Sequence, residues 1–122
     1  MSLDKLNVKY SHLIRVAIES PFSAKDSSGI EENISYLRKC IRDSLLRGEA
    51  PYASHGFFTQ PGILDDNIPE ERELGIMAGK EWEKSAAYTA VYIDRGCSKG
   101  MKLGIELAKM VGRPILYRSL GK

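Results

Sequence analysis

Residues 87–114, AYTAVYIDRGCSKGMKLGIELAKMVGRP, carry the pattern that decides the fold. The apolar run Ala87–Ile93 predicts a buried strand, and a polar, glycine-containing loop follows it at residues 94–100. A segment with one apolar face comes next and stops at Gly112, which predicts a helix. In open α/β sheets, ligands bind beyond the carboxyl end of such a strand, against the amino end of the next helix. We therefore expect one wall of a ligand site here.

The rest of the chain repeats this alternation of strand and helix. Ser28 and Glu31 have the spacing of a capping box, and Gly48 is suited to end the helix that begins there. Pro69 suits the first turn of a second helix. Short parallel strands joined by helices predict an α/β fold, a three-layer flavodoxin- or Rossmann-like domain with a four-stranded parallel sheet in the order 2-1-3-4. The four strands are expected at residues 13–18, 49–53, 87–93 and 114–117.

Length and composition predict one soluble globular domain. The 122 residues suffice for a single core, which we place at residues 13–120 after a polar lead-in at 1–12. The net charge is only +2 and no basic stripe or long apolar run is present, so neither a nucleic-acid polymer nor a membrane is expected as partner. Without a signal-like segment, a cytoplasmic location is the default. Cys40 and Cys97 are expected to be one core thiol and one loop thiol.

Three loops should meet at the carboxyl end of the predicted sheet. In the order 2-1-3-4 the crevice at the switch point lies between residues 19–23 and 94–100. The long loop at residues 54–67 leaves the second strand at the same end and can fold over that crevice. A ligand pocket is therefore expected where these loops converge.

The predicted amino end of the last helix suits an anionic or strongly accepting group. Free backbone N–H groups at Ser98, Lys99 and Gly100 could bind a phosphate or a ribose oxygen, or Ser98 could simply cap the helix. Neither a P-loop nor a G-x-G-x-x-G motif is present, so a dinucleotide cofactor is not expected. Asp94 could accept hydrogen bonds from sugar hydroxyls or cap the loop that it begins.

Glu19 and His55 are the side chains best suited to chemistry. A carboxylate at the end of a buried strand could act as a nucleophile or stabilise an oxocarbenium-like centre, or it could form an ion pair with Arg15 or Arg118. His55 could act as a base or contact phosphate, whereas a lone histidine gives little support for a metal site. Aromatic side chains could stack on a nucleobase or belong to the core; these are Phe22, Phe57 and Phe58.

The predicted helix at residues 69–85 carries two glycines four residues apart. Gly75 and Gly79 lower its intrinsic stability by about 1 kcal/mol each relative to alanine. The inward face is expected to hold either Leu74 or Gly75, together with Ala78, Gly79 and Trp82. Close approach of a neighbour, either a helix of another subunit or a ligand, would explain the two glycines.

Three runs resemble a known superfamily: IESPFS at residues 18–23, SHGFFTQPGILDDNIPEER at 54–72, and the S-x-G-M-x-x-x-I-x-x-A-x-x-x-G-x-P pattern at 98–114. They are similar to the nucleoside 2-deoxyribosyltransferase-like superfamily, and most closely to a small uncharacterised branch from bacteria and phages. The resemblance implies cleavage or exchange of an N-glycosidic bond in a homo-oligomer. It also implies a nucleophilic glutamate four residues after Gly100, where this chain has Gly104.

Two hypotheses follow from the missing glutamate. In the first, the protein is an N-glycosidic hydrolase or deoxyribosyltransferase in which Glu19 replaces the nucleophile, assisted by Asp66 or His55. In the second, it binds a nucleotide or a nucleotide-derived signal without turnover. Both take a nucleoside or nucleotide as the small-molecule partner and need no metal or other cofactor. The expected ligand-binding residues are Ser20, Pro21, Phe22, Phe57, Asp94, Ser98, Gly100 and Met101.

Overall fold

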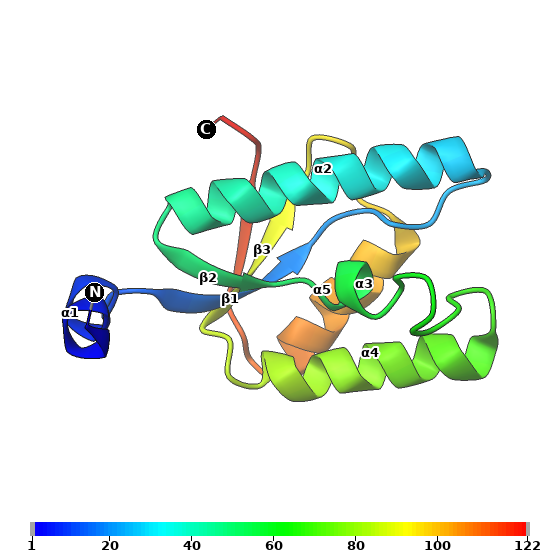
Figure 1. Ribbon diagram of the computed structural model, residues 1–122. Helices are drawn as coiled ribbons and strands as arrows, with labels where there is room; N and C mark the ends of the chain where they lie inside the picture. The colour runs from blue at the N-terminus through cyan, green and yellow to red at the C-terminus, as the bar shows by residue number, and fades with distance from the viewer. Residues whose placement is uncertain (1, 122) are drawn as a thin grey trace.

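A computed structural model describes residues 2–121 and shows an α/β domain built on one parallel sheet (Figure 1). The four strands pair in the order β2-β1-β3-β4, all parallel, so the predicted fold class and strand order are confirmed. In chain order the elements are α1 (Leu3–Lys9), β1 (Ile14–Glu19), α2 (Ser27–Leu46), β2 (Glu49–Tyr52), α3 (Ser54–Phe57), α4 (Pro69–Glu83), β3 (Tyr88–Tyr92), α5 (Lys99–Met110) and β4 (Ile115–Arg118).

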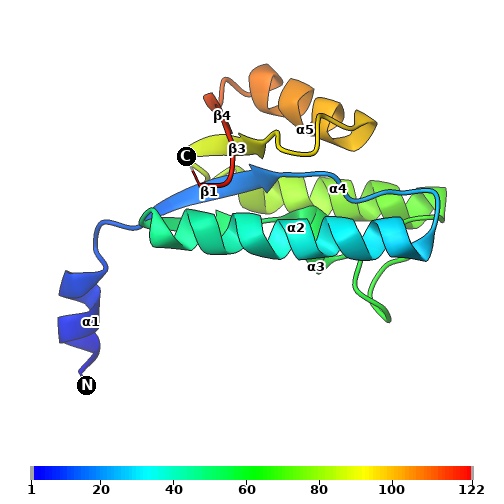
Figure 2. The same ribbon diagram turned by 90° about the horizontal axis from the view of Figure 1, so that it is seen from above.

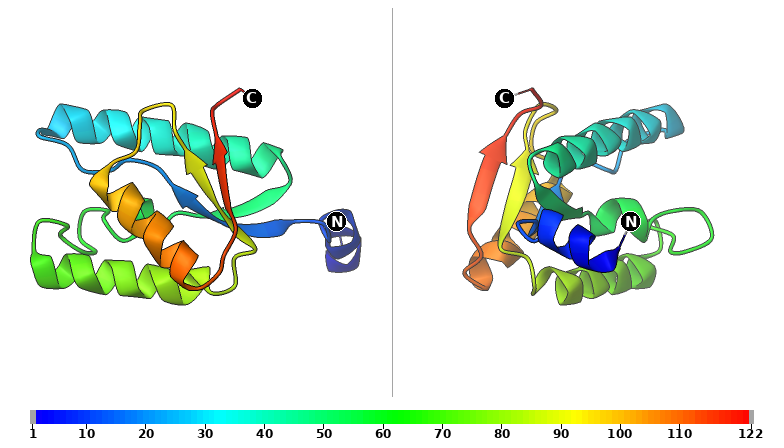
Figure 3. Two further views of the ribbon diagram at one scale, coloured as in Figure 1. Left: turned by 180° about the vertical axis from the view of Figure 1, so that it is seen from behind. Right: turned by 60° about the vertical axis from the view of Figure 1, so that its left-hand side comes forward.

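Helices cover both faces of the sheet. Helix α2 lies on one face, and α4 and α5 lie on the other (Figures 2 and 3). Strand residues alternate between two apolar clusters. Val16, Ile18 and Ala90 pack with Leu37 of α2, whereas Val91 packs with Met101 and Ile105 of α5. Because successive side chains of a strand point to opposite faces, each strand contributes apolar side chains to both faces of the sheet.

The lead-in expected at residues 1–12 contains a helix instead. The Ser2 hydroxyl accepts a hydrogen bond from the Lys5 N–H, and Asp4 and Lys9 complement the helix dipole at the two ends of α1. None of the residues of α1 is buried, and the helix projects away from the sheet (Figure 1). Local capping without apolar burial explains why the helix exists and why the hydrophobic pattern did not reveal it.

The boundaries of α2 differ slightly from the predicted ones. Asp26, rather than Ser28, caps the helix, because its carboxylate accepts a hydrogen bond from the Gly29 N–H at 2.8 Å. Gly48 follows the helix with φ of +90°, a conformation that glycine adopts without strain. Cys40 is buried and Cys97 is exposed, and both are free thiols.

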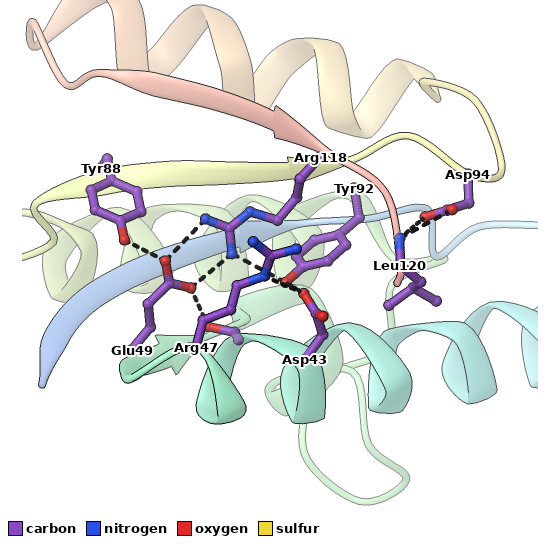
Figure 4. Close-up of polar contacts among 9 residues, drawn as sticks. Asp43, Arg47, Glu49, Tyr88, Tyr92, Asp94, Arg118 and Leu120 are labelled. Atoms are coloured by element: carbon purple, nitrogen blue, oxygen red, sulfur yellow. Dashed lines mark hydrogen bonds and ion pairs between the residues drawn. The ribbon is translucent and has the colours of Figure 1, made fainter. Parts of the chain in front are cut away.

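A polar cluster beneath the end of α2 joins the two edge strands (Figure 4). Arg118 of β4 donates two hydrogen bonds, at 2.8 and 2.9 Å, to the carboxylate of Glu49 in β2. Tyr88 and Ser44 donate to the same carboxylate. Burial alone would raise the pKa of Glu49, but these partners outweigh it and hold the pKa at about 2. The ion pair therefore fixes β2 and β4 across the intervening strands.

No helix within residues 2–121 is both long enough and apolar enough to cross a membrane.

Candidate functional site

A cavity of about 470 Å³ opens at the carboxyl end of the sheet. All three expected loops contribute to it, through Glu19 and Ser20 at the end of β1, His55 of α3, and Ser98 before α5. Two further walls come from the inner face of α4 and the body of α5. Their members are Glu71, Arg72, Gly75, Ile76, Lys80, Glu83, Leu103, Gly104 and Leu107, and Arg113 joins them from the loop after α5.

Glu19 projects from the end of β1 into the space that Gly104 leaves open. A Cβ atom on Gly104 would lie 2.7 Å from Glu19 Oε1 and closer still to Oε2, so only glycine fits beside this carboxyl group. Among residues 2–121, no group donates a hydrogen bond to it. Burial, together with the negative charge of Glu83, raises the pKa of Glu19 to about 8, against the opposing effect of Arg113. The Glu19 carboxyl group is therefore mostly protonated at neutral pH.

The predicted alternative, an ion pair of Glu19 with Arg15 or Arg118, is not found. Arg118 binds Glu49 in the polar cluster on the other face of the sheet, and Arg15 is exposed. Glu19 is thus left to the cavity.

Glu83 and Arg113 form an ion pair in the wall of the same cavity. Their side chains are 15% and 11% exposed, and Arg113 Nη1 lies 3.8 Å from Glu83 Oε1. Burial raises the pKa of Glu83, and Arg113 and Lys80 oppose that rise. The sequence held a signal for Glu83, because it continues the Gly75, Gly79 spacing of four residues onto the same face of α4.

The glycines of α4 face the chain itself rather than another subunit. A Cβ on Gly79 would lie 2.5 Å from the Cβ of Ser54, and one on Gly75 would lie 3.2 Å from Leu64 Cδ1. They allow α3 and the following loop to pack closely on α4 and close the cavity. Of the alternatives Leu74 and Gly75 for the inward face, Gly75 is the one that faces inward, and Leu74 is 60% exposed. Trp82, also expected there, is 68% exposed.

Ser20 and His55 form a hydrogen-bonded pair on the cavity wall. Ser20 Oγ lies 2.8 Å from His55 Nε2. Burial lowers the pKa of His55 to about 4, so the imidazole is neutral at neutral pH. A neutral imidazole can orient the Ser20 hydroxyl through this hydrogen bond, but it carries no positive charge with which to bind a phosphate.

Ser98 caps α5, as one of the two predicted readings had it. Its hydroxyl accepts a hydrogen bond from the Met101 N–H at 3.2 Å, and its own N–H donates to Met101 Sδ at 3.4 Å. Lys99 and Gly100 still line the cavity beside it. This end of α5 therefore faces the cavity with one N–H group already occupied.

The remaining predicted residues divide between the cavity and its surroundings. Phe22 and Asp66 line the cavity, and Asp66 accepts a hydrogen bond from Arg72 at 3.3 Å. Asp94 takes the loop-capping role instead, because it accepts from the Tyr36 hydroxyl at 2.5 Å and from the Leu120 N–H. Pro21 and Phe57 lie outside the lining, where Pro21 is buried and Phe57 is 52% exposed.

Within residues 2–121, no three His, Cys, Asp or Glu side chains are grouped so that they could hold a metal ion.

Searches against known proteins give one structural and one family match. The structure is similar to that of a 2-deoxyribosyltransferase from the psychrotolerant bacterium Bacillus psychrosaccharolyticus, with a TM-score of 0.58, 19% identity, and coverage of 88% of this chain and 74% of that one. At this identity the likeness concerns the fold alone. No curated protein matches the sequence. The family described as a domain of unknown function, DUF7768, matches residues 14–118, and the chain belongs to that family.

Proposed function

We propose that the cavity binds a nucleoside or nucleotide and that the protein cleaves or exchanges its N-glycosidic bond. The observation that carries this proposal is the position of Glu19. Its carboxyl group fills the space beside Gly104, the position at which the resembled superfamily carries its nucleophilic glutamate. Strand β1 thus places a carboxyl group at the position where the resembled superfamily has one on its helix.

The cavity lining suits the parts of such a ligand. Phe22, Phe58 and Leu103 offer apolar surface to a base, and the Ser20 hydroxyl, oriented by His55, offers a hydrogen bond to a sugar. Lys99 at the start of α5 can pair with a phosphate. Glu19 would then face the bond between base and sugar, where positive charge develops during cleavage.

Binding without turnover is the second candidate function. The glycine at position 104 and the protonated state of Glu19 favour it, since a nucleophile must be ionised. In that case Glu19 would donate a hydrogen bond to a ring nitrogen or a carbonyl of the bound base.

The test is base release from a panel of ribo- and deoxyribonucleosides and their 5′-monophosphates, followed by chromatography. We expect the wild type to release free base and Glu19→Gln to lose at least about 100-fold in rate. Glu106→Gln is the matched control. Glu106 is an exposed glutamate of α5, the helix that carries Gly104, and its carboxylate lies 3.6 Å from Lys109.

Two results would separate the candidates. Equal base release by Glu19→Gln and wild type would refute the role of Glu19. If no panel member is cleaved but a nucleotide raises the melting temperature of the wild type, the binding function stands in place of the enzymatic one.

A further inference from the structure

We propose that Glu83, held by Arg113, is the second reacting carboxylate of the cavity, and that it divides the acid and base roles with Glu19. Glu19 keeps a proton and gives it to the departing base, while Glu83 stays charged and takes the proton of the attacking water. This inference rests on the proposed function of N-glycosidic cleavage.

The geometry of α4 brings Glu83 into the site. Gly75, Gly79 and Glu83 follow one another at intervals of four residues, so they share one face of the helix, and Gly75 and Glu83 line the cavity. A Cβ on Gly79 would lie 3.4 Å from Glu83 Oε2, so the glycine also leaves room for this carboxylate. Each carboxyl group of the pair therefore lies beside a glycine.

Arg113 is fixed independently of Glu83. Its backbone N–H donates to the carbonyl of Ala108 at the end of α5, at 2.9 Å. Its guanidinium donates to Thr89 Oγ1 of β3, at 3.4 Å, and lies 3.8 Å from Glu83 Oε1. The cation is therefore held in place by β3 and α5 before any ligand arrives.

The charges assign the proton to one member of the pair. Two carboxylates that share one buried arginine retain a single balanced negative charge when one of them is protonated. Glu83 makes the direct ion pair, whereas no group in the described part of the chain donates a hydrogen bond to Glu19, so Glu83 keeps the charge. The other charged or titratable groups that line the cavity are Lys80 beside Glu83, the neutral His55, the Asp66–Arg72 pair, Glu71 and Lys99.

The reaction balances with these two groups and one water. The Glu19 carboxyl group donates its proton to the base nitrogen as the bond from C1′ to that nitrogen breaks and its electron pair passes to the base. The water oxygen bonds to C1′, and the proton it loses goes to the Glu83 carboxylate. Glu83 then releases that proton to solvent, and Glu19 takes one up. The products are free base and free sugar.

Glu83→Gln separates this role from a structural one. We expect base release to fall about 100-fold. We also expect the pKa of Glu19, followed through its carboxyl carbon by NMR in the ligand-free protein, to fall by about one unit as a negative neighbour is removed. Added azide, a small anionic nucleophile, should restore turnover of Glu83→Ala and give a glycosyl azide. Glu81→Gln is the control, because Glu81 is an exposed residue of the same helix.

Each outcome decides between the two proposals. A wild type that releases no base from any panel member refutes the proposed function, and this inference with it. An active wild type with an equally active Glu83→Gln, or an unchanged pKa of Glu19 in that variant, overturns this inference alone. Should Glu83→Gln fail to fold, Arg113→Gln provides the second variant. It removes a positive neighbour and should raise the pKa of Glu19, and an unchanged value overturns the inference.

Discussion

Two glutamates withdrawn from solvent behave in opposite ways in this domain. Glu49 begins β2 and meets Arg118, Tyr88 and Ser44, so its pKa falls to about 2. Glu19 ends β1 and meets no donor among residues 2–121, so burial raises its pKa to about 8. Burial opposes ionisation of both carboxyl groups, and the hydrogen-bond and charge partners decide whether the pKa rises or falls.

The two positions also differ in what surrounds them. Glu49 lies within the polar cluster that joins the edge strands (Figure 4), where every partner comes from secondary structure. Glu19 lies at the carboxyl end of the sheet, where loops and helix ends leave a cavity. An unsatisfied carboxyl group in a cavity costs stability, and such groups concentrate at functional sites. The difference separates a structural glutamate from a candidate reacting one.

The largest stability effect is expected on the structural side. Arg118→Met removes the cation that donates two hydrogen bonds to Glu49 and leaves a buried carboxylate. We expect a loss of about 3–5 kcal/mol in the free energy of unfolding, measured with urea. Lys109→Met, which breaks only the exposed contact with Glu106, should cost less than about 0.5 kcal/mol. Equal losses in both variants would mean that the buried pair is not special.

The pH dependence of stability should differ in sign between the two glutamates. The folded-state pKa of Glu19 is about 8 against an ordinary 4.5, so its contribution is present below pH 4.5 and is lost as the pH rises through 8. Glu83, whose pKa is also raised, acts in the same direction. For Glu49, at about 2, the contribution is present above pH 4.5 and is lost as the pH falls toward 2.

Urea unfolding across pH 3–9 measures the opposite pH dependences of the Glu19 and Glu49 contributions to stability. Glu19→Gln should exceed the wild type in stability at pH 9 by on the order of 2 kcal/mol and match it near pH 4. Glu49→Gln should be less stable than the wild type at neutral pH, with a weaker decline toward acid. A Glu19→Gln variant that gains nothing at pH 9 would show that Glu19 is ionised without cost.

A more local effect tests the close approach at Gly104. Gly104→Ala forces the Glu19 carboxyl group aside, so the free energy of unfolding should fall by about 1–3 kcal/mol. The same displacement should also weaken ligand binding. Gly100→Ala on the same helix meets only Ser98 Oγ at 4.0 Å and should change stability by no more than about 1 kcal/mol, measured in the same urea titration. Recovery of stability in the double variant Gly104→Ala/Glu19→Ala would locate the clash at Glu19, and no recovery would locate it elsewhere.

Periodic apolar patterns explain why the fold was predictable. The strand at residues 88–92 follows from its continuous apolar run, and the helix after it follows from one apolar face that begins after Ser98 and stops at Gly112. Helix α1 was missed because caps and charges, rather than an apolar face, support it. The Asp26 cap was missed because Ser28 and Glu31 offered an equally good local signal.

The cavity was predictable only in part. Its three loops follow from the strand order, since parallel strands bring their carboxyl ends to one edge. The α4 wall was foreseen only as one of two alternatives, because Gly75 and Gly79 were expected to face either a ligand or another subunit. Gly75 lines the cavity, whereas Ser54 of the same chain packs on Gly79. That closure places Glu83 in the site.

The sequence by itself determined the order of the elements, the parallel sheet and the end of the sheet at which the cavity opens, because these depend on local periodicity and chain direction. Only the tertiary structure decided which glutamate has partners. Arg118 reaches Glu49 across two strands, and Gly104 leaves its space to Glu19 from a distant helix. Such pairings depend on how separate elements pack in space, and no local spacing in the sequence encodes them.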